Sequence, residues 1–308
     1  MKTLACALLF LTARLASAAI INVEFKFTPF LGNPATDQEV TTVPGKTQIF
    51  INDVPYGAEQ EVRQEKLPVL FDEHEVGPSV ALSMSSAGSI VRKGKNKVRI
   101  EFTPNDPAKS YRAQLRWASV TDEPTSELDG NNEQATNRTA EGVDDRKDVK
   151  GKVVFEREFT ADFALDLPWH HYPAVQELTE DDKQKMVALL KTRADWFQPD
   201  FSALYKAIEE NDSLKVDDVR SAHCLEAAYK AGVRVSAPTV ADLNFTTTGG
   251  PEVIVTRKAG TLFGLDEKTF AAVKDEGTEM CAGMVLATVY PGRMGIVRRP
   301  DGTWETVD

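Results

Sequence analysis

The chain has 308 residues, of which 36 are basic and 47 acidic, so its formal net charge is −11. Hydrophobic residues make up 42%, and the 19 Gly, 16 Pro and 3 Cys exclude collagen-like, low-complexity and small disulfide-framework proteins. The length predicts about two domains, each large enough to bury its own core. The acidic excess argues against nucleic acid or an anionic membrane as the main partner.

The first 18 residues have the three parts of an export signal. Lys2 gives a positive start, an apolar run follows, and Ala16-Ser17-Ala18 supplies small residues before a cleavage site at Ala19. An uncleaved anchor is the alternative, but the run is shorter than the about 20 residues of a spanning helix. We therefore expect residues 1–18 to be a signal peptide and the protein to be exported, to the periplasm or the extracellular space. The mature chain would carry a net charge of −13 and no membrane span.

Removal of the signal leaves two cysteines, Cys224 and Cys281, which are 57 positions apart. In an oxidising compartment such a pair predicts one disulfide. Two buried, unpaired thiols are the alternative, because free cysteine is among the most buried residue types. A catalytic pair of His223 with Cys224 is disfavoured, since adjacent residues on a helix do not face each other.

The first half of the chain shows the alternation of apolar and polar residues that half-buried strands have. The pattern begins at Ile21 and recurs, for example from Lys97 to Phe102 and from Tyr111 to Trp117, with Pro/Gly turns between the runs. Residues 19–167 therefore predict an all-β antiparallel sandwich. Within it, residues 121–150 hold nine acidic and four basic residues and few large apolar ones. We expect this segment to be a mobile acidic hairpin loop, with a domain linker as the alternative.

After Pro168 the apolar spacing becomes helical, which predicts an α+β domain over residues 175–308. Thr179 followed by three carboxylates predicts a helix start. A second helix is expected after Pro199, a third from Ser213 to Gly232 and a fourth from Asp266 to Lys274. The expected strands are Val233–Val235, Ala241–Thr246, Glu252–Arg257, Met280–Tyr290, Arg293–Arg298 and Thr303–Val307.

Two stretches resemble known families. Leu189–Asp195 followed by Phe201–Tyr205, with a closing Asp301–Trp304 turn, makes residues 175–308 similar to nuclear transport factor 2-like domains. This resemblance implies helices packed on a curved antiparallel sheet, in a cone-shaped fold that serves isomerases, cyclases and non-catalytic binding modules. Phe50–Val54 and Lys93–Val98 give residues 20–167 a generic resemblance to immunoglobulin-like or galactose-binding-like sandwiches.

The candidate ligand-binding residues are Trp169, His170, His171 and Tyr172, which lie between two prolines where the β half meets the helical half. Aromatic rings beside imidazoles can line a pocket or stack on sugars, and packing at the domain boundary is the alternative. The segment from Asp72 to Glu75 is the densest group of metal-ligand types. Its residues are adjacent and would point to opposite faces of a strand, and no HExxH or CxxC motif occurs, so we expect no metal and no cofactor.

The sequence shows no nucleophile–base set, phosphate-binding loop or dinucleotide fingerprint, and we assign no catalytic residue. It favours an exported, non-catalytic binding or assembly module of the cell envelope, with an unidentified protein or small molecule as its ligand. One alternative is a small-molecule hydrolase or isomerase that uses a pocket in the C-terminal domain. Another is a carbohydrate-binding sandwich.

Overall fold

The structure, a computed structural model, describes residues 19–70, 75–128, 134–211, 214–265, 267–270, 273 and 275–307. The expected signal peptide, and the segment Asp72–His74 considered for metal binding, lie outside the described residues. The chain divides into two compact units. The first unit comprises residues up to Ile51 together with Pro55–Leu165, and the second comprises Asn52–Val54 and Asp166–Asp308.

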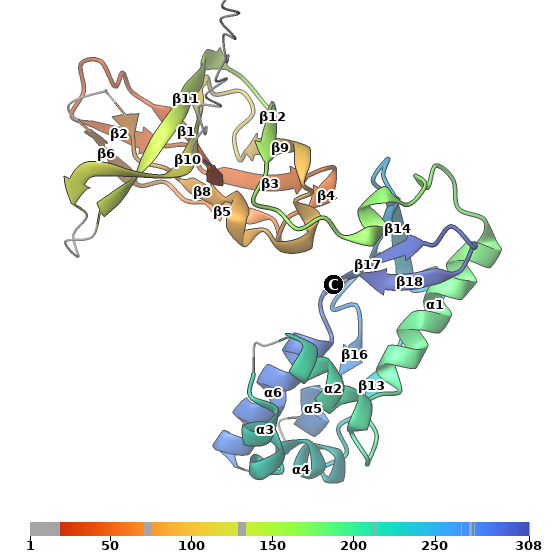
Figure 1. The fold of residues 1–308 in the computed structure, drawn as a ribbon. Coiled ribbons are helices and arrows are strands. Elements are labelled where there is room, and N and C mark those ends of the chain that lie inside the picture. Colours follow the sequence, from red (N-terminus) through yellow and green to blue (C-terminus); the bar gives the residue numbers. More distant parts are fainter. Residues whose placement is uncertain are drawn as a thin grey trace, which may run out of the picture. The chain divides into compact units, whose positions relative to one another are not determined.

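The first unit contains two mostly antiparallel sheets (Figure 1). One has the order β11-β10-β1-β2-β6-β7, with β8 paired to β1, and the other has the order β12-β9-β3-β4, with β5 paired to β3. The first sheet consists of β1 (Ile20–Leu31), β2 (Glu39–Thr42), β6 (Lys66–Leu70), β7 (Glu75–Val76), β8 (Val80–Ser83), β10 (Tyr111–Leu128) and β11 (Gln134–Val149). The second consists of β3 (Gly45–Ile51), β4 (Val54–Pro55), β5 (Gln60–Val62), β9 (Gly94–Pro104) and β12 (Val153–Ala161), and two 3₁₀ turns, η1 (Met84–Ser86) and η2 (Gly88–Ile90), precede β9.

Phenylalanine side chains from both sheets share one core. The ring of Phe27 on β1 lies 5.9 Å from that of Phe102 on β9 and 5.7 Å from that of Phe155 on β12, and Phe25 lies 5.5 Å from Phe159. All five are buried, because the alternation along each strand turns every second residue inward. This shared core fits the expected β-sandwich.

The acidic segment 121–150 differs from the expected loop. Residues up to Leu128 belong to β10 and those from Gln134 to Val149 belong to β11, and the two strands pair along their length. The segment forms a hairpin as expected, but most of it is strand, because backbone hydrogen bonds pair strands even where the side chains are polar. Mobility of the segment stays a prediction. Charges also pair across the strands, as Arg112 does with Asp145. Gly142 fits this register, since a Cβ there would clash with the indole ring of Trp117 on β10.

The second unit combines helices with a four-stranded antiparallel sheet of order β14-β15-β17-β18 and a short pair β13-β16. Its strands are β13 (Val235–Ser236), β14 (Leu243–Thr247), β15 (Glu252–Arg257), β16 (Gly264–Leu265), β17 (Arg293–Arg298) and β18 (Trp304–Val307). Its helices are η3 (Pro168–His171), α1 (Glu180–Ala194), α2 (Ser202–Asn211), α3 (Val216–Ala222), α4 (Cys224–Lys230), η4 (Val240–Asp242), α5 (Glu267–Phe270) and α6 (Glu276–Val289).

The predicted start of the first long helix is confirmed. The Thr179 hydroxyl accepts a hydrogen bond from the Asp182 backbone N–H at 3.1 Å, and the Asp182 carboxylate accepts one from the Thr179 backbone N–H at 3.0 Å. This reciprocal cap satisfies two donors that a helix start leaves unpaired. The indole N–H of Trp304 donates to the other oxygen of Asp182 at 3.2 Å, so the cap also ties α1 to β18.

Two predictions for the second unit were wrong. The expected strand Met280–Tyr290 is part of helix α6, which begins after Asp275, whose carboxylate accepts from the Thr278 N–H at 2.7 Å. The expected third helix is divided into α3 and α4 at His223, which adopts a left-handed conformation with φ 49°. In α6 nearly every residue from 280 to 290 is apolar, so its spacing does not distinguish a helix from a buried strand.

The predicted disulfide is confirmed between Cys224 and Cys281, with 6.1 Å between their Cα atoms. It joins α4 to α6, whose residues Ala282, Val285 and Val289 are buried in the core of the second unit. At the end of α6, the guanidinium of Arg193 donates to the Val289 carbonyl at 2.8 Å. A cation at this position neutralises the partial negative charge of the helix C-terminus.

Among the described helices, none has the length and apolar character that crossing a membrane requires.

Breaking the Cys224–Cys281 bond should lower the free energy of unfolding of the second unit by about 4 kcal/mol, because the bond closes a loop of 57 residues. Urea titrations of the protein with and without reductant measure this loss. Cys281→Ser should be destabilised to the same extent and should not respond to reductant. Equal midpoints for the oxidised and the fully reduced protein would contradict the prediction.

The cap at α1 predicts a pH dependence. Burial alone would raise the pKa of Asp182, but hydrogen bonds from Thr179 and Trp304 outweigh it and hold the pKa below its usual value of 3.8. The stabilisation is therefore present above pH 3.8 and is lost as the pH falls through the lower, folded-state pKa. The difference in unfolding free energy between the wild type and Asp182→Asn should shrink between pH 6 and about pH 3. A difference that does not change with pH would show that the carboxylate charge has no role.

Candidate functional site

The four residues singled out from the sequence lie in and directly after one 3₁₀ turn, η3. Trp169 is only 9% exposed, and its ring meets the edge of the His170 ring with 4.2 Å between centroids. His171 is exposed, with Nε2 2.6 Å from a carboxylate oxygen of Asp166, and Tyr172 is half-buried. The turn brings the rings of Trp169 and His170 into contact, but Trp169 is turned inward and His171 outward. Ligand binding at these residues stays a prediction.

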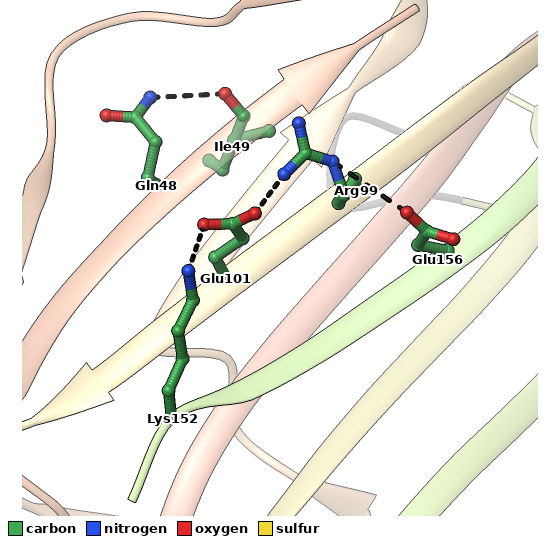
Figure 2. Close-up of polar contacts among 6 residues, drawn as sticks. All are labelled: Gln48, Ile49, Arg99, Glu101, Lys152 and Glu156. Carbon is green, nitrogen blue, oxygen red and sulfur yellow. Dashed lines mark hydrogen bonds and ion pairs between the residues drawn. The ribbon is translucent and has the colours of Figure 1, made fainter. Parts of the chain in front are cut away.

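The outer face of the sheet β12-β9-β3-β4 carries a group of ion pairs (Figure 2). Arg99 on β9 contacts Glu101 and reaches Glu156 on β12 at 3.8 Å. The same guanidinium lies over the ring of Phe50 at 3.8 Å. Lys152 binds the second oxygen of Glu101 at 2.6 Å. Since the aromatic ring lies under a guanidinium, it is not offered to a sugar or another flat ligand.

A cavity lies within the second unit, between α6, α5 and the segment that leads into β16. The cavity measures about 460 Å³. Most of the described side chains around it are apolar, and they come from three neighbouring parts of the chain: Thr261, Phe263, Leu265, Phe270, Glu279, Gly283, Leu286, Ala287, Tyr290 and Gly292. We take this cavity, hereafter the α6 pocket, as the candidate site.

The sequence of α6 explains why a pocket is open here. The helix buries Val285 and Val289 in the core, whereas Gly283 and Ala287 lie one turn apart on the pocket side, where they occupy little volume. A Cβ at Gly283 would lie 3.4 Å from the Phe270 ring, so even an alanine would reduce the space. Two small residues at this spacing leave room that larger ones would fill.

Beside the pocket, α6 exposes two methionines that do not line it. Met280 is 63% exposed and Met284 47% exposed, and the four-residue spacing puts them on one side of the helix, next to Gly283 and Ala287. Methionine side chains are flexible and adapt to the shape of apolar ligands. The exposed surface of α6 beside the pocket is therefore apolar in part.

The pocket contains a tyrosine in an unusual environment. The ring of Tyr290 packs against Phe263 with 5.1 Å between centroids, and its buried hydroxyl has no hydrogen-bond partner of good geometry among the described residues. The positive charge of Arg193 and the Phe197 backbone N–H act to lower the pKa of Tyr290, and that N–H also donates to the Ala194 carbonyl. Burial is the larger effect and raises the pKa of Tyr290 far above its usual range, so this group is a neutral phenol at physiological pH.

The described side chains do not assemble a metal-binding group. Within the described ranges, no group of three or more His, Cys, Asp or Glu side chains could hold a metal ion. Of the described residues that line the α6 pocket, Glu279 and Tyr290 have ionisable side chains. The arrangement supports binding by shape and apolar contact.

The sequence alone does not predict the α6 pocket. Its lining residues carry no motif, and Met280–Tyr290 was expected to be a strand. The available signal was the combination of Gly283 with two methionines in an apolar run. That signal becomes informative only after the run is placed on a helix.

Comparisons with protein-family models, curated proteins and solved structures find no match to this chain. The resemblances to nuclear transport factor 2-like domains and to immunoglobulin-like or galactose-binding-like sandwiches stay predictions. Function is therefore inferred from the geometry of the chain itself.

We expect that removing the buried hydroxyl of Tyr290 does not destabilise the protein strongly. Because it is buried without a good partner, Tyr290→Phe should change the free energy of unfolding by less than about 1 kcal/mol at pH 7, or should increase it. The wild type should then lose stability relative to Tyr290→Phe above about pH 10, where the phenol ionises in the unfolded chain only. Urea titrations at pH 7 and pH 10.5 measure both effects. A loss of several kcal/mol at pH 7 would show that the hydroxyl has a strong partner.

Proposed function

We propose that the protein is an exported, non-catalytic binding protein that holds an apolar small molecule in the α6 pocket. The observation that supports this most directly is the pocket, with a volume of about 460 Å³ and mainly apolar side chains around it. Sites for small molecules in proteins typically measure a few hundred to about 1,000 Å³ and combine an apolar lining with few polar groups. The α6 pocket has both properties.

The disulfide supports the proposal that the protein is exported. Disulfides persist in oxidising compartments, and the Cys224–Cys281 bond is fully formed between two helices of the second unit. We further propose that the chain is a β-sandwich followed by an α+β domain in which helices pack on a curved antiparallel sheet. A contiguous core that joins α1, α6 and the sheet β14-β15-β17-β18 supports this arrangement.

An enzymatic use of the same pocket, as a hydrolase or isomerase, is less well supported. Such chemistry needs a general acid or base within hydrogen-bond reach of a nucleophile or a second polar group. Among the described lining residues, Tyr290 is held neutral by burial, and no hydrogen bond joins its hydroxyl to Glu279. Binding requires neither feature.

A carbohydrate-binding function of the first unit also has less support. Sugar rings stack on exposed aromatic faces. In the described part of the chain, the exposed large apolar side chains are aliphatic or methionine, and none is aromatic. Phe50 on the outer sheet face is covered by Arg99.

The proposal predicts that a neutral apolar fluorophore, N-phenyl-1-naphthylamine, binds the protein and that filling the pocket prevents it. Ala287 is exposed at the rim, so Ala287→Phe should fold normally and weaken binding at least about tenfold by occupying the space. Ala188→Phe is the matched control, since Ala188 is exposed on α1 and does not line the pocket. Fluorescence titration measures both affinities. If the wild type does not bind the probe, or if the two variants bind it equally well, the α6 pocket is not the site.

A further inference from the structure

The α6 pocket contains one described carboxylate, that of Glu279, among apolar side chains. Its backbone N–H belongs to the first turn of α6, where it donates to the Asp275 carbonyl at 2.9 Å. The side chain is half-buried. Among the side chains that the structure describes, which do not include those of Lys268 and Lys274, no cationic group forms an ion pair with it. Glu101 and Asp144, in contrast, both bind arginine.

One described cation, Arg257, lies beside the pocket without lining it. Arg257 directs its guanidinium to the Thr261 carbonyl, at 3.5 Å, and it lies close to Gly264 on β16. It is not among the residues that line the cavity. Of the described lining residues, Glu279 is the one that carries a charge at neutral pH, and that charge is negative.

We propose that the α6 pocket selects apolar molecules that carry one cationic amino group, so that the ammonium binds Glu279 and the hydrocarbon part packs against Phe263, Leu265 and Phe270. This inference rests on the proposed function and names its ligand class. A carboxylate in an apolar pocket binds an ammonium more strongly than it would in water, because fewer water molecules compete for either charge. An apolar acid would instead bring a second negative charge to Glu279.

The charge of the whole chain favours the same class of ligand. The formal net charge is −11, so the surrounding potential attracts cations and repels anions. This long-range effect does not depend on any single residue, whereas binding to Glu279 does. The two contributions can therefore be separated by comparing two variants that remove the same charge from different places.

The test uses three ligands with the same ten-carbon chain: decylamine, decanol and decanoate. Each ligand is titrated at pH 7 into protein that has bound N-phenyl-1-naphthylamine, and the displacement of this probe is measured. The ligand concentrations stay below the critical micelle concentration of each ligand. The wild type should bind decylamine about tenfold more tightly than decanol, and decanoate most weakly. Glu279→Gln should remove the advantage of the amine and leave the affinity for decanol nearly unchanged.

Glu276→Gln is the matched control. Glu276 lies one turn earlier on α6, is exposed and does not line the pocket, so this variant changes the net charge equally and should keep the order of the three ligands. If the three ligands bind equally well, or if Glu279→Gln and Glu276→Gln have the same effect, the inference is wrong although the pocket still binds apolar molecules. If the probe itself does not bind, so that no displacement can be measured, the proposed function is wrong.

Discussion

The second unit depends on how helix α6 is buried. The core-facing residues Ala282, Val285 and Val289 fix the helix, the Cys224–Cys281 bond joins it to α4, and Arg193 binds the carbonyl at its end. These three attachments lie on one side of the helix or at its end. The other side therefore keeps small or exposed apolar residues, and the space beside them is the α6 pocket. One face of α6 thus packs into the stable core, and another face borders the open apolar site.

Much of the fold could be predicted where a pattern has a single physical explanation. Alternating residues such as those around Phe25 and Phe102 predict strands with one buried side, and Thr179 before three carboxylates predicts a helix cap. A lone pair of cysteines predicts one bond. The prediction was wrong where the pattern fits two structures. The apolar run that became α6 fits a helix or a buried strand, and the acidic hairpin of β10 and β11 is held by backbone bonds that side-chain composition does not reveal.

The candidate site was harder to predict than the fold, because it is formed by tertiary packing. Phe263, Phe270 and Leu286 come from separate elements, and nothing in their spacing shows that they surround one cavity. Trp169 and His171 looked more informative because the chain has only 4 tryptophans and 4 histidines, yet the structure turns Trp169 inward. Glu279 becomes distinctive only when its neighbours are known to be apolar, since a single carboxylate among 47 acidic residues carries no signal of its own.

The most direct measurement is a methyl NMR titration of methionine-labelled protein with an apolar ligand such as decanol. Met280 and Met284 lie beside the α6 pocket, whereas Met84 is buried in the core of the first unit and Met186 in that of the second. If the pocket is the binding site, the signals of Met280 and Met284 shift with ligand concentration and saturate together, and that of Met84 stays in place. Unchanged signals from Met280 and Met284 while Met84 shifts, or no shift at any methionine, would contradict the assignment of the site to α6.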